Sequence, residues 1–94
     1  MTAFEIEFDY RAYRVMPDMA LVAEIKDELG GLAELKEKFS RNGWTVTELV
    51  ALVQILLQRA GKTVDYIELG DKMLKESFAA YLGAVRSFLK QIPD

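Results

Sequence analysis

One segment limits the folds open to this chain more than any other, because it is apolar on nearly every side. Residues 46–60 begin directly after Thr45 and contain Glu48, a spacing typical of a capping box that satisfies free backbone N–H groups at a helix start. The large apolar residues of the segment are Leu49, Val50, Leu52, Val53, Ile55, Leu56 and Leu57. Such a helix has to be covered on more than one face. The pattern therefore predicts a central helix over residues 46–60 that ends at Gly61.

Residues 3–16 have the period-two pattern of half-buried strands. Phe4, Ile6 and Phe8 alternate with acidic residues, which places the three apolar side chains on one face. An isolated two-stranded hairpin is marginally stable in water. We therefore expect this apolar face to rest on helices.

A two-residue turn at Asp9 and Tyr10 would give this hairpin a specific register. It places Glu5 opposite Arg14, which is a favourable cross-strand pair of opposite charges. It also places Tyr13 opposite Ile6, on the buried face. Tyr10 is a poor residue for the positive φ that such a turn requires, so a longer or bulged turn with a shifted register is the alternative.

Two short helices are expected between the hairpin and the central helix. Pro17 and Asp18 open the first, over residues 18–29, with the proline in its first turn, and Gly30-Gly31 ends it. The second covers about 32–41. An Asn-Gly turn then leads to Trp44 and the capping box.

The C-terminal part is predicted to form two further helices, over residues 64–75 and 77–92. Thr63 is expected to cap the first, with Val64, Ile67 and Leu74 directed inward, and Ser77 to cap the second. The apolar residues on the two sides of Ser77 stay in phase. One continuous helix over about 64–92 is therefore the alternative.

These elements predict an α+β domain that is mostly α. An N-terminal two-stranded antiparallel hairpin packs on a bundle of four to five short helices, and no repeat, low-complexity tract or linker divides residues 1–94. We expect a single domain.

The composition excludes several kinds of site. The chain has no cysteine and no histidine, which removes Ser-His-Asp and Cys-His nucleophile systems and the usual zinc sites. An enzyme that uses carboxylates and lysines needs them to converge in a cleft, and no such group is visible. We expect a protein that is not an enzyme and that needs no cofactor and no metal.

Charge and hydropathy disfavour nucleic acid and membrane partners. The net charge is −3, with 12 basic residues scattered among 15 acidic ones, whereas a phosphate backbone attracts clustered Lys and Arg. The apolar run at Leu49–Val53 is far shorter than the roughly 20 residues of a membrane helix. Acidic residues stand near the N-terminus where a signal peptide has basic ones. We expect a cytoplasmic protein.

Function by binding another protein is the interpretation that remains. Tyrosine and tryptophan are frequent at interface hot spots, and an amphipathic terminal helix can dock into a groove of a partner. The candidate partner-binding residues are Tyr10, Tyr13, Trp44 and Phe88. Trp44 could instead pack on the start of the central helix, and the last helix could cover that helix. The acidic residues of the first strand are interpreted as a solvated sheet face that protects an edge strand, rather than as a cation site.

The order of the elements resembles the small tail assembly chaperone family of tailed phages and gene transfer agents. In that family a strand–turn–strand unit leads into a helix that stops at glycine before an "slxxL" helix. Here the matching parts are Phe4–Val15, Met19–Gly31 and Gly31-Leu32-Ala33-Glu34-Leu35. An apolar helix that ends in glycine, followed by Thr and an acid, is matched by Glu48–Gly61, Thr63 and Asp65.

Two features depart from the family pattern. Asp9 and Tyr10 stand where a turn that contains glycine is usual, and the helix after Thr63 is unusually polar, with Glu68 and Asp71. The resemblance implies a non-enzymatic factor in the cytoplasm of the bacterial host, which holds tape measure or tail tube proteins soluble during tail assembly. It transfers no catalytic residues. The alternative is a small helical adaptor or regulatory module unrelated to tails, and a homo-oligomer is compatible with either function.

Overall fold

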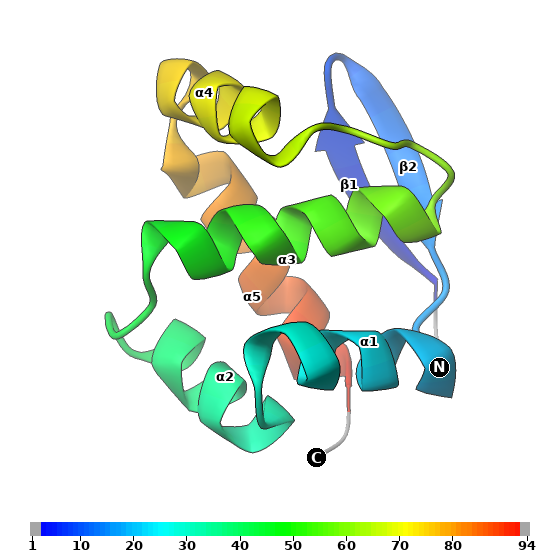
Figure 1. The fold of residues 1–94 in the computed structure, drawn as a ribbon, viewed down its shortest axis with the longest axis vertical. Coiled ribbons are helices and arrows are strands. Elements are labelled where there is room, and N and C mark those ends of the chain that lie inside the picture. The colour runs from blue at the N-terminus through cyan, green and yellow to red at the C-terminus, as the bar shows by residue number, and fades with distance from the viewer. Residues whose placement is uncertain (1–2, 93–94) are drawn as a thin grey trace.

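A hairpin and four helices are arranged around one central helix in the computed structural model, which describes residues 3–92 (Figure 1). The expected α+β, mostly helical fold class is confirmed. The elements in chain order are β1 (Phe4–Phe8), β2 (Arg11–Val15), α1 (Met19–Leu29), α2 (Leu32–Ser40), α3 (Val46–Arg59), α4 (Tyr66–Glu76) and α5 (Phe78–Gln91).

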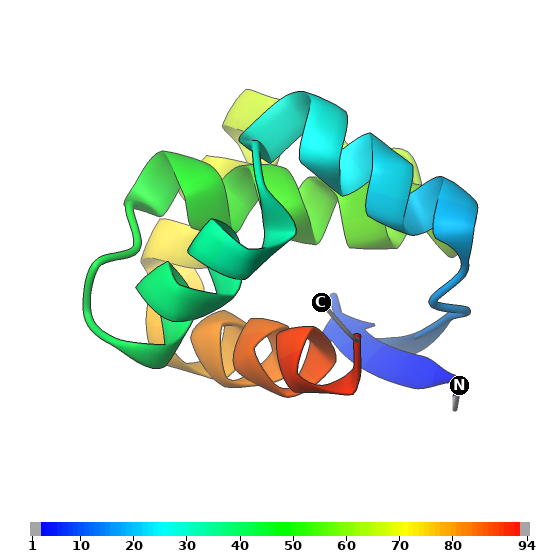
Figure 2. The same cartoon turned by 90° about the horizontal axis from the view of Figure 1, so that it is seen from below.

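The central helix is α3, as its sequence predicts. Thr45 Oγ1 accepts a hydrogen bond from the backbone N–H of Glu48 at 3.2 Å, and Glu48 Oε1 accepts one from the Thr45 N–H at 3.0 Å, which completes the capping box. Helices α1, α4 and α5 and strand β2 all pack on α3. Figure 2 shows α1 on one side of α3, and α5 with the hairpin on the other. The apolar residues that surround α3 are therefore buried on more than one face.

The hairpin has the register that the alternation predicts. Phe4 lies opposite Val15 and Glu5 opposite Arg14, and the latter two form an exposed ion pair at 3.7 Å. Asp9 and Tyr10 have φ values of 54° and 64°, as the two central residues of a type I′ turn require. The longer or bulged turn is wrong. The tight turn forms although neither residue is glycine.

Two helix starts differ from the prediction. Pro17 precedes α1 rather than lying in its first turn, because Asp18 is the N-cap and its Oδ1 accepts from the Leu21 N–H at 2.9 Å. Thr63 does not cap α4. Asp65 does, and its Oδ2 accepts from the backbone N–H groups of Ile67 and Glu68, both at 3.1 Å. In each case an aspartate is the residue whose carboxylate reaches the free N–H groups.

The buried face of α4 also differs from the prediction. Ile67 and Leu74 were expected to point inward, but their exposed fractions are 66% and 64%. The buried residues are Leu69 and Met73, one helical turn apart. Gly70 lies against α3, where an added Cβ would be 3.8 Å from the Val50 methyl groups. Close contact between α3 and α4 at this glycine selects the buried face.

The chain breaks between α4 and α5 at Ser77, so the continuous helix is wrong. Ser77 has φ 117° and ψ 128°, which no helix accommodates. Its backbone N–H donates to the Met73 carbonyl at 2.9 Å, and its Oγ accepts from the Ala79 N–H at 3.2 Å. One residue thus ends α4 and caps α5.

The positive φ of Tyr10 makes a prediction about stability. Tyr10→Gly should raise the free energy of unfolding by about 0.5–1 kcal/mol, because glycine adopts this φ without steric cost and the exposed ring contributes no packing. Urea denaturation measures the change. Tyr10→Ala keeps the unfavourable φ and is the matched control, so equal effects of the two variants would contradict the prediction.

Ser77 gives a second prediction. Ser77→Ala should lower the free energy of unfolding by about 1 kcal/mol, because it loses the cap on α5 and keeps a side chain at a φ of 117°. Ser77→Gly loses the same cap but relieves the backbone, so its loss should be only a few tenths of a kcal/mol. Thermal or urea unfolding of both variants tests this order, and the reverse order would refute it.

Candidate functional site

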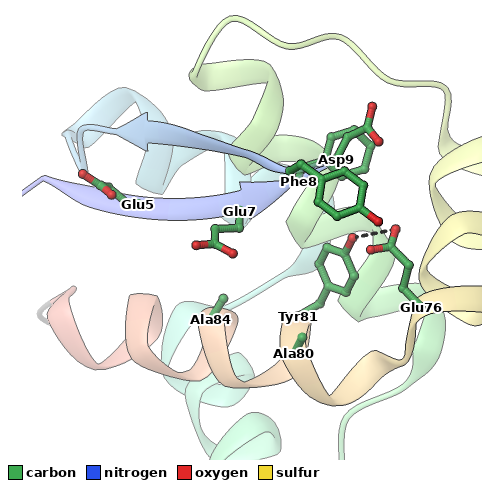
Figure 3. Close-up of a pocket in the computed structure, with 9 residues that line it drawn as sticks. Glu5, Glu7, Phe8, Asp9, Glu76, Ala80, Tyr81 and Ala84 are labelled. Atoms are coloured by element: carbon green, nitrogen blue, oxygen red, sulfur yellow. Dashed lines mark hydrogen bonds between the residues drawn. The ribbon is translucent and has the colours of Figure 1, made fainter.

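A groove lies between β1 and α5 at the end of the domain that carries the hairpin turn (Figure 3). Its volume is about 410 Å³. Residues of β1, of the turn, of the end of α4 and of the first half of α5 line it, namely Glu5, Glu7, Phe8, Asp9, Tyr10, Glu76, Ala80, Tyr81 and Ala84. We call it the β1–α5 groove.

The lining combines acidic groups with a floor of small side chains. It contains four carboxylates and neither lysine nor arginine among the described residues. Figure 3 shows Glu7 directed from β1 into the gap above Ala84, with Ala80 and Tyr81 further along the same helix. The carboxylates do not gather around one point in this view. The groove is therefore suited to binding along its length.

A small polar network fixes the end of the groove nearest the turn. Tyr81 Oη donates to Glu76 Oε1 at 3.3 Å. Burial, followed by the negative charge of Glu76, raises the pKa of Tyr81 to about 12, so the hydroxyl stays protonated at neutral pH. Lys72 Nζ lies 3.2 Å from Asp9 Oδ1 and 3.2 Å from Glu76 Oε1, and 5.6 Å from the centre of the Phe8 ring. Lys72 thereby connects the hairpin turn to α4.

Tyr10 is fully exposed at the tip of the hairpin, with an exposed fraction of 106%. Its ring makes no contribution to the core, although its backbone has an unfavourable φ of 64°. A strained and fully exposed aromatic residue is a reasonable contact for a partner. Its role as a binding residue stays a prediction.

The other three predicted binding residues are all at least partly buried in the packing of the domain. Tyr13 is half-buried against the core. Trp44 is half-buried too and stacks on Phe39, with ring centres 6.3 Å apart. Phe88 has an exposed fraction of 0% and meets Phe4 edge to face at 5.3 Å. Phe88 therefore has the packing role that was the alternative for the last helix.

The sequence prediction missed an apolar surface on α4. Ile67 and Leu74 are seven residues apart, and this spacing places them on one side of the helix, which we call the α4 outer face. The ion pair between Lys72 and Asp9 holds α4 next to the hairpin tip. Lys72 lies on roughly the opposite side of α4 from Ile67 and Leu74, so the α4 outer face and Tyr10 at the hairpin tip are two separate exposed apolar sites.

A second groove has the opposite charge. It lies between α2 and the C-terminal half of α5 and has a volume of about 740 Å³. Its charged lining residues are one acidic residue, Glu37, and four basic ones, Lys36, Arg41, Arg86 and Lys90. Arg86 is part of the fold, because its Nε donates to the Phe39 carbonyl at 2.7 Å. The two grooves give the ends of α5 opposite charges.

Residues 3–92 contain neither a metal-binding group of side chains nor a helix that could span a membrane. No three or more acidic side chains in this range are grouped so that they could hold a metal ion. None of the helices in the same range has the length and apolar character needed to cross a membrane.

Comparison with known proteins places the chain in a family. A family model described as "Phage tail tube protein, GTA-gp10" matches residues 2–93. No curated protein and no solved structure gave a match. The expected relation to the tails of phages and gene transfer agents is confirmed at this level, whereas the description names a tail tube protein and not an assembly chaperone. The match covers nearly the whole chain, and the protein therefore belongs to the phage tail tube protein family, GTA-gp10.

Proposed function

We propose that this protein is a non-enzymatic tail assembly chaperone. It binds a structural protein of the tail, either the tape measure or the tail tube protein, and keeps it soluble in the cytoplasm of the bacterial host until assembly. Membership of a phage tail family supports a role in tails. The same membership argues against an adaptor unrelated to tails.

The observation that carries the proposal is that large apolar side chains are exposed at two places, the α4 outer face and the hairpin tip. The core is already filled, yet Tyr10, Ile67 and Leu74 expose most of their side chains on two elements joined by the Lys72–Asp9 ion pair. Ile67 and Leu74 lie together on one side of α4, and exposed apolar residues grouped in this way are a common feature of partner-binding surfaces. The net charge of −3 keeps such a surface compatible with solubility.

A second candidate function is that of a tail tube component. The family description favours it, and the opposite charges of the two grooves beside α5 would allow successive copies to contact one another. Head-to-tail contacts between successive copies, acidic groove to basic groove, would generate a ring or a filament. The two candidates differ in what the purified protein does alone, because a tube component self-assembles and a chaperone does not.

Co-expression tests the chaperone proposal. The tape measure protein and the tail tube protein of the same tail gene cluster should each be expressed with and without this protein. We expect at least one of them to become severalfold more soluble and to co-purify with it. The purified protein alone should give no rings or tubes by electron microscopy. Unchanged solubility of both candidates without co-purification, or tubes formed by this protein alone, would refute the proposal.

A pair of surface variants tests which apolar residues take part. Ile67→Ser combined with Leu74→Ser should abolish most of the gain in solubility, because it removes the apolar α4 outer face and leaves the core intact. Met19→Ser is the matched control, since Met19 is 76% exposed but lies on α1. Each exposed substitution should change stability by no more than about 0.5 kcal/mol, which thermal unfolding checks. Equal losses in both variants would remove the α4 outer face from the proposal.

A further inference from the structure

One edge of β1 carries backbone groups that β2 does not use. The hairpin is a two-stranded sheet, so each strand has one edge without a neighbouring strand among residues 3–92. Phe8 and Arg11 close the turn, and in a two-residue hairpin this closing pair is hydrogen-bonded. Hydrogen-bonded and non-hydrogen-bonded pairs alternate from there. Glu5 and Glu7 therefore direct their N–H and C=O groups away from β2.

The β1–α5 groove lies along this unused edge. Residues of β1 line the groove and residues of β2 do not. Figures 1 and 3 agree in showing β1 on the α5 side of the hairpin. On the opposite wall, Ala80 and Ala84 leave space because their side chains are small. A volume of about 410 Å³ is within the range of roughly 300–1,000 Å³ for ligand pockets, and an added strand needs a spacing of only about 4.8 Å.

The charge around the groove limits which segment can enter. Three of the four carboxylates have a cation beside them, since Asp9 and Glu76 share Lys72 and Glu5 pairs with Arg14. Glu7 has no ion-pair partner in the described part of the chain, and its cross-strand neighbour is Ala12. A strand placed along this edge lies beside an uncompensated carboxylate. Lysine or arginine side chains on that strand would be attracted, and acidic ones repelled.

The same charges argue against a second copy of this chain. Two β1 edges paired with each other would bring the Glu5 and Glu7 side chains of both copies together. Like charges on neighbouring strands are destabilising, and charged residues on an edge strand prevent such self-pairing. The edge therefore selects a partner of opposite charge.

We propose that the β1–α5 groove binds an extended segment, rich in lysine or arginine, that adds to β1 as a third strand. Backbone hydrogen bonds to Glu5 and Glu7 provide affinity, and the carboxylates of the groove provide the preference for basic side chains. The inference rests on the proposed function in one respect: the segment is taken to belong to the tail protein that the chaperone binds.

Titration of the isotope-labelled full chain with a synthetic peptide tests this site. The probe is a peptide of about eight alternating lysine and valine residues with neutral ends, a typical strand length. NMR should show chemical-shift changes at Glu5, Glu7, Ala80 and Ala84, together with slower hydrogen exchange of the Glu5 and Glu7 amides. A peptide of alternating glutamate and valine should not bind. Equal binding by a lysine–valine peptide methylated on all its backbone nitrogens would overturn strand addition.

Charge variants separate this site from general attraction to an acidic protein. Glu7→Lys should weaken binding of the lysine–valine peptide about fivefold, the size expected when attraction to an exposed charge becomes repulsion. Glu28→Lys makes the same charge change on α1, where Glu28 is exposed and outside the groove, and should weaken binding by less than about twofold. Equal effects of the two variants would overturn the proposal.

The same variant distinguishes failure of this inference from failure of the proposed function. If Glu7→Lys loses peptide binding but still keeps the tail protein as soluble as the wild type does, the groove is not the client site and the chaperone proposal stands. If the peptide binds the groove but no tail protein is kept soluble by the wild type, the binding site stands and the chaperone proposal fails.

Discussion

The burial of α3 is the constraint on which the rest of the structure depends. A helix that is apolar on nearly every side gains about 1.5–3 kcal/mol for each large side chain that is fully buried, and only if other elements cover all its faces. Each neighbouring element therefore contributes an apolar face to the core around α3. The outer face of α4 and the tip of the hairpin are surfaces that α3 does not need. Partner binding can evolve there without loss of the core.

The hairpin shows how this arrangement prepares a binding edge. Two strands alone are marginal in water, and here the Phe4–Phe88 contact holds one end while the Lys72–Asp9 ion pair holds the turn. The edge of β1 is thus fixed before any partner arrives. A segment that adds to an ordered edge loses only its own conformational freedom, which favours binding relative to an edge that has to fold at the same time.

How much was predictable from the sequence depended on how many independent patterns agreed. The register of the hairpin was predictable because alternation and the opposite charges of Glu5 and Arg14 gave the same answer. The start of α3 was predictable because its capping box is local. The buried face of α4 was not predictable, because its sequence allows either the side with Ile67 or the side with Leu69 to be buried. Only the packing of Gly70 against α3 decides between the two. Local sequence patterns determine where the helices and strands occur, whereas packing between them determines which side of each one is buried.

The candidate site was less predictable than the fold, for a related reason. Tyr10 is in the sequence prediction because a turn exposes its central residues. The β1–α5 groove is not, because it joins residues about 70 positions apart and requires the break at Ser77 to direct α5 beside β1. The relation to phage tails was predictable from the order of elements, whereas a choice between chaperone and tube component depends on surfaces that only the folded chain presents.

Whether the exposed surface is mainly apolar or mainly charged helps to distinguish a chaperone from a tube component. A permanent tube needs interfaces between copies that are large and mainly apolar, in the range of roughly 2,000 Å² or more for obligate contacts. In this domain the exposed large apolar residues are few, and the two grooves on α5 are lined by charged side chains. Charged contacts accelerate association and are weakened by salt, so they suit a complex that forms quickly and is later released. Release is what an assembly factor requires and what a tube subunit has to avoid, and on this ground the charged grooves favour the chaperone over the tube component.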